Sequence, residues 1–120
     1  MPKINIKVTL KGKEDTLCSK VTGTINKNTL RYTEEDGTKM AFNYNTNKLI
    51  RDTKELRMTF DFEKEELVIK YKELDVHMNL KMELIRLEKD NYNVEVEYVL
   101  DNTHEKEKLI YRIEEQKWVF

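Results

Sequence analysis

The stretch that decides the fold is Leu74–Leu87, which reads L-D-V-H-M-N-L-K-M-E-L-I-R-L. From Leu74 to Leu84 an apolar residue occupies every second position, with a polar or charged residue between each pair. This period of two is typical of a β-strand with one buried and one wet face, whereas a helix would scatter the same residues around its axis. At Leu84–Ile85 the alternation shifts by one position, which predicts a β-bulge that bends the strand.

Shorter segments with the same alternation occupy most of the remaining chain. Polar turns with Gly, Asn or Asp join them, and Asp36-Gly37 is the strongest hairpin signal. Gly23 lies inside one segment and indicates a bend or a close approach of two backbones. The total is about ten strands, and the short turns make consecutive strands antiparallel neighbours. The shorter segments are Ile4–Leu10, Leu17–Ile25, Leu30–Tyr32, Met40–Tyr44, Lys48–Arg51, Leu56–Phe62, Leu67–Tyr71, Val94–Tyr98 and Leu109–Ile113.

These strands predict a closed sheet. An open sheet of about ten strands with one apolar face would leave that face and two strand edges in water. Closing the sheet on itself removes both problems. We therefore predict an all-β fold, a single antiparallel up-and-down calycin- or lipocalin-like β-barrel of about eight to ten strands. One domain would span residues 1–120. A two-sheet sandwich is the alternative, but its Greek-key crossings need longer connections than most of those present.

The composition argues against several functional classes. The net charge of the 120 residues is only -1, so we expect no nucleic-acid partner, because nucleic-acid-binding domains carry a net basic surface. Cys18 is the single cysteine, and the chain lacks the paired Cys and His spacing of a zinc site. His77 and His104 stand apart and form neither a metal site nor a catalytic triad. We therefore expect no metal, no cofactor and no enzymatic activity.

The sequence also carries a prediction about location. The N-terminal residues enter a strand without the apolar core of a signal peptide. No segment is apolar for long enough to span a membrane. We expect a cytoplasmic protein without membrane insertion, present as a monomer or dimer.

Arg51 is the first candidate ligand-binding residue. It shares one face of its strand with Leu49, and Ile50 lies on the opposite face. If Leu49 points into the barrel, Arg51 also points inward and could bind a carboxylate or phosphate through two hydrogen bonds. If Ile50 points inward instead, Arg51 is a solvated side chain. Alternation does not decide between these orientations.

The tyrosines form a second candidate group. Tyr32, Tyr44, Tyr71, Tyr98 and Tyr111 all fall on the apolar faces of their strands. Their hydroxyl groups could line a ligand cavity. Alternatively, the rings fill the core and the hydroxyl groups reach the ends of the barrel. If a ligand with a polar head enters the barrel, Tyr71, Tyr98 and Tyr111 are its expected contacts, together with Arg51.

The order of several short motifs resembles the YwiB-like family. This resemblance implies a small bacterial calycin-like β-barrel of unknown function, and it covers the chain from about Ile4 to Ile113. The family has no established catalytic residues, so the resemblance implies a fold and no reaction. The matching motifs are Thr22-Gly23, Leu30-Arg31-Tyr32-Thr33-Glu34-Glu35, Leu49-Ile50-Arg51, Met58-Thr59-Phe60, Tyr71 and Val96-Glu97-Tyr98-Val99-Leu100.

Two classes of function remain open at this point. The first is a non-enzymatic binder of a small lipophilic or anionic ligand inside the barrel. The second is a filled barrel that acts as a protein-interaction module, with an exposed apolar patch near Trp118, Val119 and Phe120. The inward face is rich in bulky residues, and a small barrel has limited interior room. Residue size therefore limits the space for a ligand but does not decide between the two classes.

Overall fold

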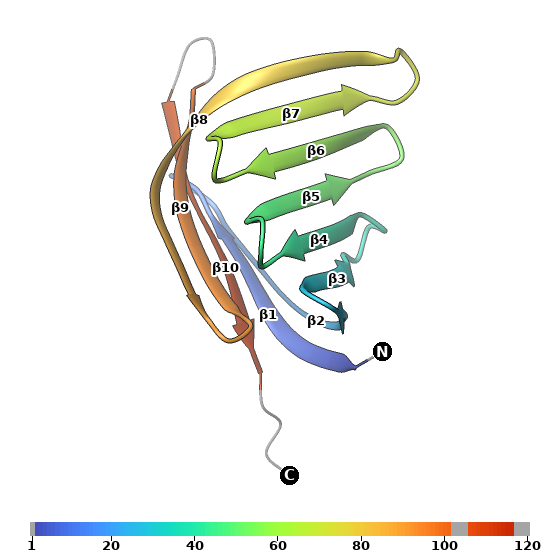
Figure 1. Cartoon of the computed structure of the whole chain (residues 1–120), viewed down its shortest axis with the longest axis vertical. Helices are drawn as coiled ribbons and strands as arrows, with labels where there is room; N and C mark the ends of the chain where they lie inside the picture. Colours follow the sequence, from blue (N-terminus) through green and yellow to red (C-terminus); the bar gives the residue numbers. More distant parts are fainter. Residues whose placement is uncertain (1, 102–105, 117–120) are drawn as a thin grey trace.

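The computed structural model describes residues 2–101 and 106–116, which form ten strands and no helix. Each strand pairs antiparallel with the next, and β10 pairs with β1, so the strands close into an up-and-down barrel (Figure 1). This architecture confirms the predicted all-β barrel. The strands are β1 (Lys3–Lys11), β2 (Thr16–Asn26), β3 (Thr29–Thr33), β4 (Lys39–Asn43), β5 (Lys48–Asp52), β6 (Leu56–Asp61), β7 (Glu66–Tyr71), β8 (Val76–Asp90), β9 (Asn93–Asp101) and β10 (Lys106–Glu115).

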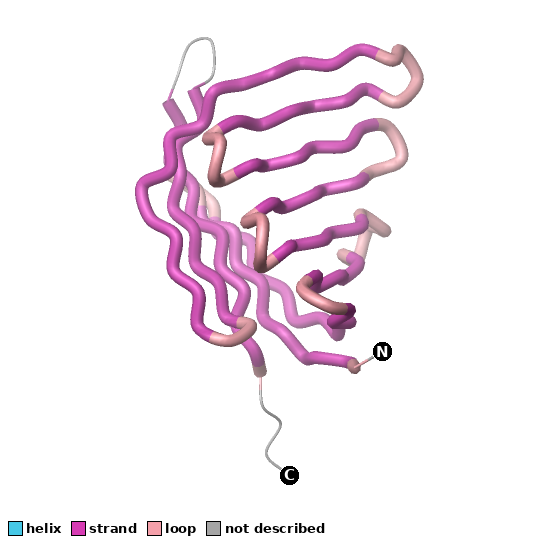
Figure 2. Tube along the Cα trace, viewed as in Figure 1, coloured by secondary structure: helices cyan, strands magenta, loops and turns pink. Residues whose placement is uncertain are grey.

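The strands of the closed barrel lie in two layers, which we call its two sheets (Figure 2). Two strands belong to both layers. Residues 76–81 of β8 pair with β7, and β8 pairs with β9 from Met82 onward. Similarly, β2 pairs with β1 over residues 16–24 but with β3 only over residues 24–26. In Figure 1, β3–β7 and the first part of β8 are stacked on the right, and β9, β10 and β1 run across them on the left. β8 and β2 therefore pass from one sheet into the other.

β8 bends at the predicted bulge. Leu84 and Arg86 pair with consecutive residues of β9, so Ile85 is the extra residue between them. This register shift confirms the bulge and its position. The strand itself begins two residues later than the alternation indicates. Leu74 lies instead in the β7–β8 turn, where Asp75 has a positive φ of 50°.

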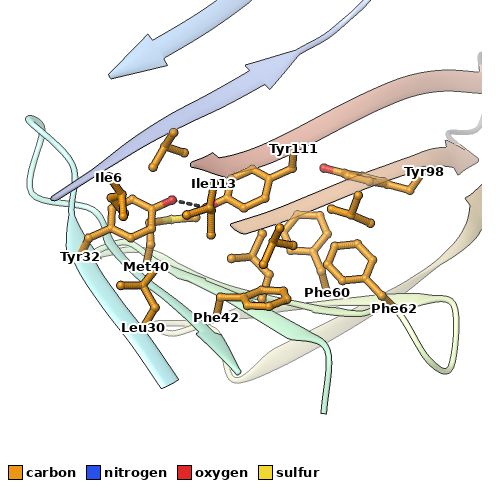
Figure 3. Packing of buried hydrophobic residues seen from close by; sticks show 14 of the residues in the cluster. Ile6, Leu30, Tyr32, Met40, Phe42, Phe60, Phe62, Tyr98, Tyr111 and Ile113 are labelled. Carbon is orange, nitrogen blue, oxygen red and sulfur yellow. Dashed lines mark hydrogen bonds between the residues drawn. The ribbon is translucent and has the colours of Figure 1, made fainter. Parts of the chain in front are cut away.

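Inward-facing side chains fill the middle of the barrel. The hydroxyl groups of Tyr32 on β3 and Tyr111 on β10 form a hydrogen bond across the interior and so join the two sheets (Figure 3). The Tyr98 ring packs against Phe60 and Phe62, with centroid separations of 5.9 and 5.5 Å. The other buried apolar residues are Ile4, Ile6, Val8, Ile25, Leu30, Met40, Phe42, Leu49, Leu67, Met82, Val94, Val96 and Ile113.

Gly23 lies where β2 passes between the sheets. A Cβ atom at this position would lie 2.7 Å from the carbonyl oxygen of Arg31 on β3. That separation is too short for any Cβ contact, so only glycine fits without a shift of the backbone. The distance confirms the close approach that Gly23 indicates in the sequence.

We expect Gly23→Ala to lower the free energy of unfolding by about 1–3 kcal/mol, because the added methyl group must displace backbone atoms. Gly12→Ala is the matched control, since the nearest atom to its added Cβ would lie 3.5 Å away, at an ordinary contact distance. Urea unfolding of both variants measures the difference. An equally small loss in both variants would contradict the tight contact at Gly23.

Ion pairs link the outer faces of β8, β9 and β10. Glu95 on β9 lies 3.1 Å from the Arg86 guanidinium and 2.6 Å from that of Arg112. Hydrogen bonds from Arg86 and Arg112 hold the pKa of Glu95 below its ordinary value. Glu97 lies 2.5 Å from the Lys108 ammonium, whose hydrogen bond lowers the pKa of Glu97. These two carboxylates therefore tie β9 to both of its neighbours.

The lowered pKa values give stability a defined pH dependence. The ionised Glu95 contributes to the free energy of unfolding. This contribution is fully present above the unfolded-state pKa of about 4.3, and it is lost as the pH falls through the lower folded-state pKa. We expect Glu95→Gln to be less stable than the parent at pH 7 and to lose less further stability on acidification. Glu83→Gln, at an exposed position of β8, is the control. Parallel stability curves for the parent and Glu95→Gln between pH 7 and pH 3 would contradict this expectation.

Candidate functional site

The interior of the barrel is uncovered along the first part of β8. Val76 and Met78 lie directly opposite Tyr71 and Ile69 of β7. Those two residues share the inward face of β7 with Leu67, which is buried. Val76 and Met78 therefore face inward, yet they are 50% and 44% exposed. Figure 1 shows this part of β8 at the upper edge of its sheet, with a strand on one side only.

A set of inward-facing, partly exposed residues continues from this edge along β7, β6 and β5. Tyr71 lies opposite Leu56, and Ile69 lies opposite Met58. All four are half-buried. We call the set the open interior face. It consists of Arg51, Leu56, Met58, Ile69, Tyr71, Val76 and Met78.

Arg51 belongs to this face. Leu49 is 3% exposed and lies in the core, so Arg51, two residues later on β5, points to the same side. The register places Arg51 directly between Met40 on β4 and Met58 on β6. The structure thus selects the inward orientation that alternation left open, and it places Ile50 on the outer face.

One cross-strand row connects Arg51 to the edge of the sheet. Arg51 lies opposite Met58, Met58 opposite Ile69, and Ile69 opposite Met78. Neighbouring strands are about 4.8 Å apart, so the row extends for about 14 Å from Arg51 to Met78. It begins with a cation and continues with the half-buried Met58 and Ile69 to the exposed Met78.

The Arg51 guanidinium has no ion-pair partner among the described residues. Its charge nevertheless acts on two neighbours. Burial raises the pKa of Tyr32, and the positive charge of Arg51 partly opposes that rise. Hydrogen bonds from Thr38 hold the pKa of Asp36 low, and Arg51 lowers it further. Arg51 is therefore a half-buried cation whose hydrogen-bonding fork is open to an added anion.

Tyr111 and Tyr98, two of the predicted ligand contacts, lie in the packed core. Tyr111 is 4% exposed, its hydroxyl group is bonded to that of Tyr32, and burial raises its pKa. Tyr98 is 3% exposed, and its pKa is raised by burial and by the charge of Glu107. Both hydroxyl groups therefore stay protonated at neutral pH. Of the four predicted residues, the structure brings Arg51 and Tyr71 to one open face and places these two tyrosines in the core.

Tyr44 forms hydrogen bonds with residues of β8 and the β8–β9 turn. Its hydroxyl group donates a hydrogen bond of 2.9 Å to the carbonyl oxygen of Tyr92. The Lys89 ammonium donates one of 2.8 Å to the carbonyl oxygen of Tyr44. These bonds tie the end of β4 to the β8–β9 turn, so this tyrosine has a structural role.

Met58 and Met78, the methionines of the open interior face, are candidate-site residues that the sequence pattern did not single out. Alternation marks Met58 and Met78 as ordinary core residues, because it reports which face a side chain takes and not what covers that face. Their exposure depends on which strand lies beside β8. The signal that could have found them is the abundance of methionine on the inward face, since flexible thioether side chains suit adaptable binding surfaces.

The other candidate residues that the structure describes lie on the surface. Cys18 and His77 are both exposed. Within residues 2–101 and 106–116, no group of three or more His, Cys, Asp or Glu side chains could hold a metal ion. The same part of the chain has no helix of the length and apolar character needed to cross a membrane. His104 and the predicted apolar patch at Trp118–Phe120 lie outside the described residues.

Comparison of the chain with protein-family models, with curated proteins and with solved structures gives no match. The resemblance to the YwiB-like family therefore stays a prediction from short motifs. A barrel fold alone is compatible with many functions, so function has to be argued from the site.

Proposed function

We propose that the protein is a cytoplasmic, calycin-like and non-enzymatic binder of a small amphipathic anion. The head group, a carboxylate or a similar anion, would bind Arg51, and the apolar tail would lie along the open interior face. The observation that carries this proposal is the row from Arg51 through Met58 and Ile69 to Met78. In this row a cation without an ion-pair partner among the described residues leads directly onto partly exposed apolar side chains.

The head-group position follows from the chemistry of Arg51. A guanidinium can donate two parallel hydrogen bonds to one carboxylate. A half-buried cation loses part of its hydration, and a bound carboxylate compensates for that loss through a direct ion pair. Tyr71 lies on the same face and can contribute a hydroxyl group nearer the edge.

The tail position follows from the packing of the barrel. The hydrogen-bonded pair Tyr32 and Tyr111 fills the middle, together with the Tyr98 aromatic cluster. A ligand would therefore lie on the open interior face and would not pass through the centre. Covering apolar surface there contributes about 25 cal/mol per Å². Methionine side chains can adapt to tails of different shape.

The packed middle of the barrel also favours a second candidate function, that of a protein-interaction module. Leu74, in the β7–β8 turn, is 72% exposed and adjoins the exposed Val76. A partner protein that covers this apolar edge would bury both residues. In that case β8 is the contact, and small amphiphiles do not bind at Arg51.

Substitution of Arg51 distinguishes these functions. We expect the parent protein to bind dodecanoate, and we expect Arg51→Gln to weaken this binding by about tenfold or more, because hydrogen bonds to a charged group contribute about 1.5–3 kcal/mol. Binding of dodecanol, which has the same tail without the charge, should change little. Isothermal titration calorimetry measures both affinities. Lys70→Gln, at an exposed position of β7, is the matched control.

Met78→Ser tests the tail site separately. Since Met78 lies on the apolar part of the row, its substitution should weaken the binding of dodecanoate and of dodecanol to a similar degree. Circular dichroism establishes that each variant retains the barrel. Absence of dodecanoate binding, or equal affinity of the parent and Arg51→Gln, would contradict the ligand-binding proposal and favour the interaction module.

A further inference from the structure

A groove with a volume of about 700 Å³ crosses the outer face of β2–β6. It lies where β2 and β3 separate, and it has no residue in common with the open interior face. Its charged lining residues, within the part of the chain that the structure describes, are Arg31, Lys39, Arg57 and Asp52. Three cations therefore line the groove together with one carboxylate.

The carboxylate of Asp52 is fully engaged. Its Oδ2 atom accepts hydrogen bonds from Arg57 Nε at 3.1 Å and from Nη2 at 2.7 Å. Its Oδ1 atom is bonded to the Lys72 ammonium. Lys39 lies directly opposite Asp52 in the register but is not paired with it. The positive charge of Lys39 is thus available, and Arg57 is held by Asp52 with part of its donor fork still free.

Arg31 adds a second available cation. It lies on the outer face of β3, is exposed, and has no ion pair with any residue in the described ranges. The register places it directly opposite Ala41, which in turn lies opposite Ile50. Ala41 and Ile50 therefore form a small apolar floor with Arg31 at one end, and Lys39 and Arg57 lie in the adjacent cross-strand row.

Backbone donors also point into the gap between β2 and β3. The Ile25 N–H donates to Pro2 on the β1 side, so the alternation along β2 directs the N–H and C=O groups of Thr22 toward β3. By the same rule, the Glu34 N–H donates to Thr38 on the β4 side, which directs the backbone groups of Thr33 toward β2. Pairing between β2 and β3 ends at Thr24, so Thr22 and Thr33 have no cross-strand partner there among the described residues.

We propose that this groove is a second binding site, independent of the open interior face, for a small organic phosphate. The phosphate would bind Arg31 and Lys39, with Arg57 and the Thr22 and Thr33 amides as further donors. The organic group would lie on Ala41 and Ile50. The volume falls within the range of about 300–1,000 Å³ that small-molecule sites occupy.

The donor set favours phosphate over a carboxylate. Two guanidinium groups, an ammonium and two backbone amides offer more donors than the two oxygens of a carboxylate can accept. A phosphate ester presents three charged or partly charged oxygens to the same groups. The apolar floor is small, so the organic part is compact and not a long acyl chain.

Phenyl phosphate is a suitable probe, and ¹H–¹⁵N correlation spectra at low ionic strength provide the readout. We expect saturable shifts that include the Thr22 and Thr33 amides. The double variant Arg31→Gln/Lys39→Gln should bind phenyl phosphate at least about tenfold more weakly, because two charge-assisted contacts are lost. Lys70→Gln, which removes an exposed cation of β7 outside the groove, should bind like the parent. Arg51→Gln should also bind like the parent, which separates this site from the interior one.

Three outcomes would overturn the proposal. The first is the absence of saturation with phenyl phosphate. The second is an equal loss of affinity in the double variant and in Lys70→Gln, which would indicate non-specific attraction to surface charge. The third is binding of a hexaglutamate peptide at the Thr22 and Thr33 amides without binding of phenyl phosphate, which would identify the open strand edge as a protein contact.

Discussion

The pairing of β8 with two different strands is the constraint on which the rest of the structure depends. A backbone N–H or C=O group that is buried without a partner is strongly unfavourable, so a sheet with one apolar face must either expose two edges or close. β8 allows closure because its first part pairs with β7 and its second part with β9. The extra residue Ile85 follows this change of partner and lies within the part that pairs with β9. A bulge bends a strand and increases its local twist, which helps β8 to follow the curvature of the barrel.

The same constraint explains where the molecule is open. A strand that changes sheets is paired on only one side over most of its length. Over residues 76–81 this leaves the inward-facing Val76 and Met78 only partly covered, which creates the open interior face. β2 changes sheets on the other side of the barrel, and it pairs with β3 over residues 24–26 only. The resulting gap opens outward and forms the groove beside Thr22 and Thr33. Both candidate sites are therefore products of barrel closure.

Local sequence patterns predict the features that depend only on residues close together in the sequence. Alternation predicts the strands, the phase shift at Leu84–Ile85 predicts the bulge, and Gly23 predicts the close backbone approach. Alternation could not orient Arg51, because Leu49 and Ile50 are both apolar and either could have been the buried residue. It also could not predict the exposure of Met78 or the assembly of the groove. Those features depend on the register between strands that are distant in sequence, and no short pattern encodes that register.

The pleat of β5 explains why the charges of Arg51 and Asp52 lie on opposite faces of the sheet. Arg51 and Asp52 are neighbours in sequence, but successive side chains of a strand point to opposite faces. Asp52 therefore cannot neutralise Arg51, and it binds Arg57 and Lys72 on the outer face instead. Inside the barrel, burial keeps the Tyr32 hydroxyl group near Arg51 protonated, so it cannot supply a negative charge either. The strand geometry thus separates the two residues. Arg51 lies on the inner face without an ion pair among the described residues, and Asp52 binds two cations on the outer face. In the proposed function, a bound anion supplies the direct ion pair that Arg51 lacks among the described residues.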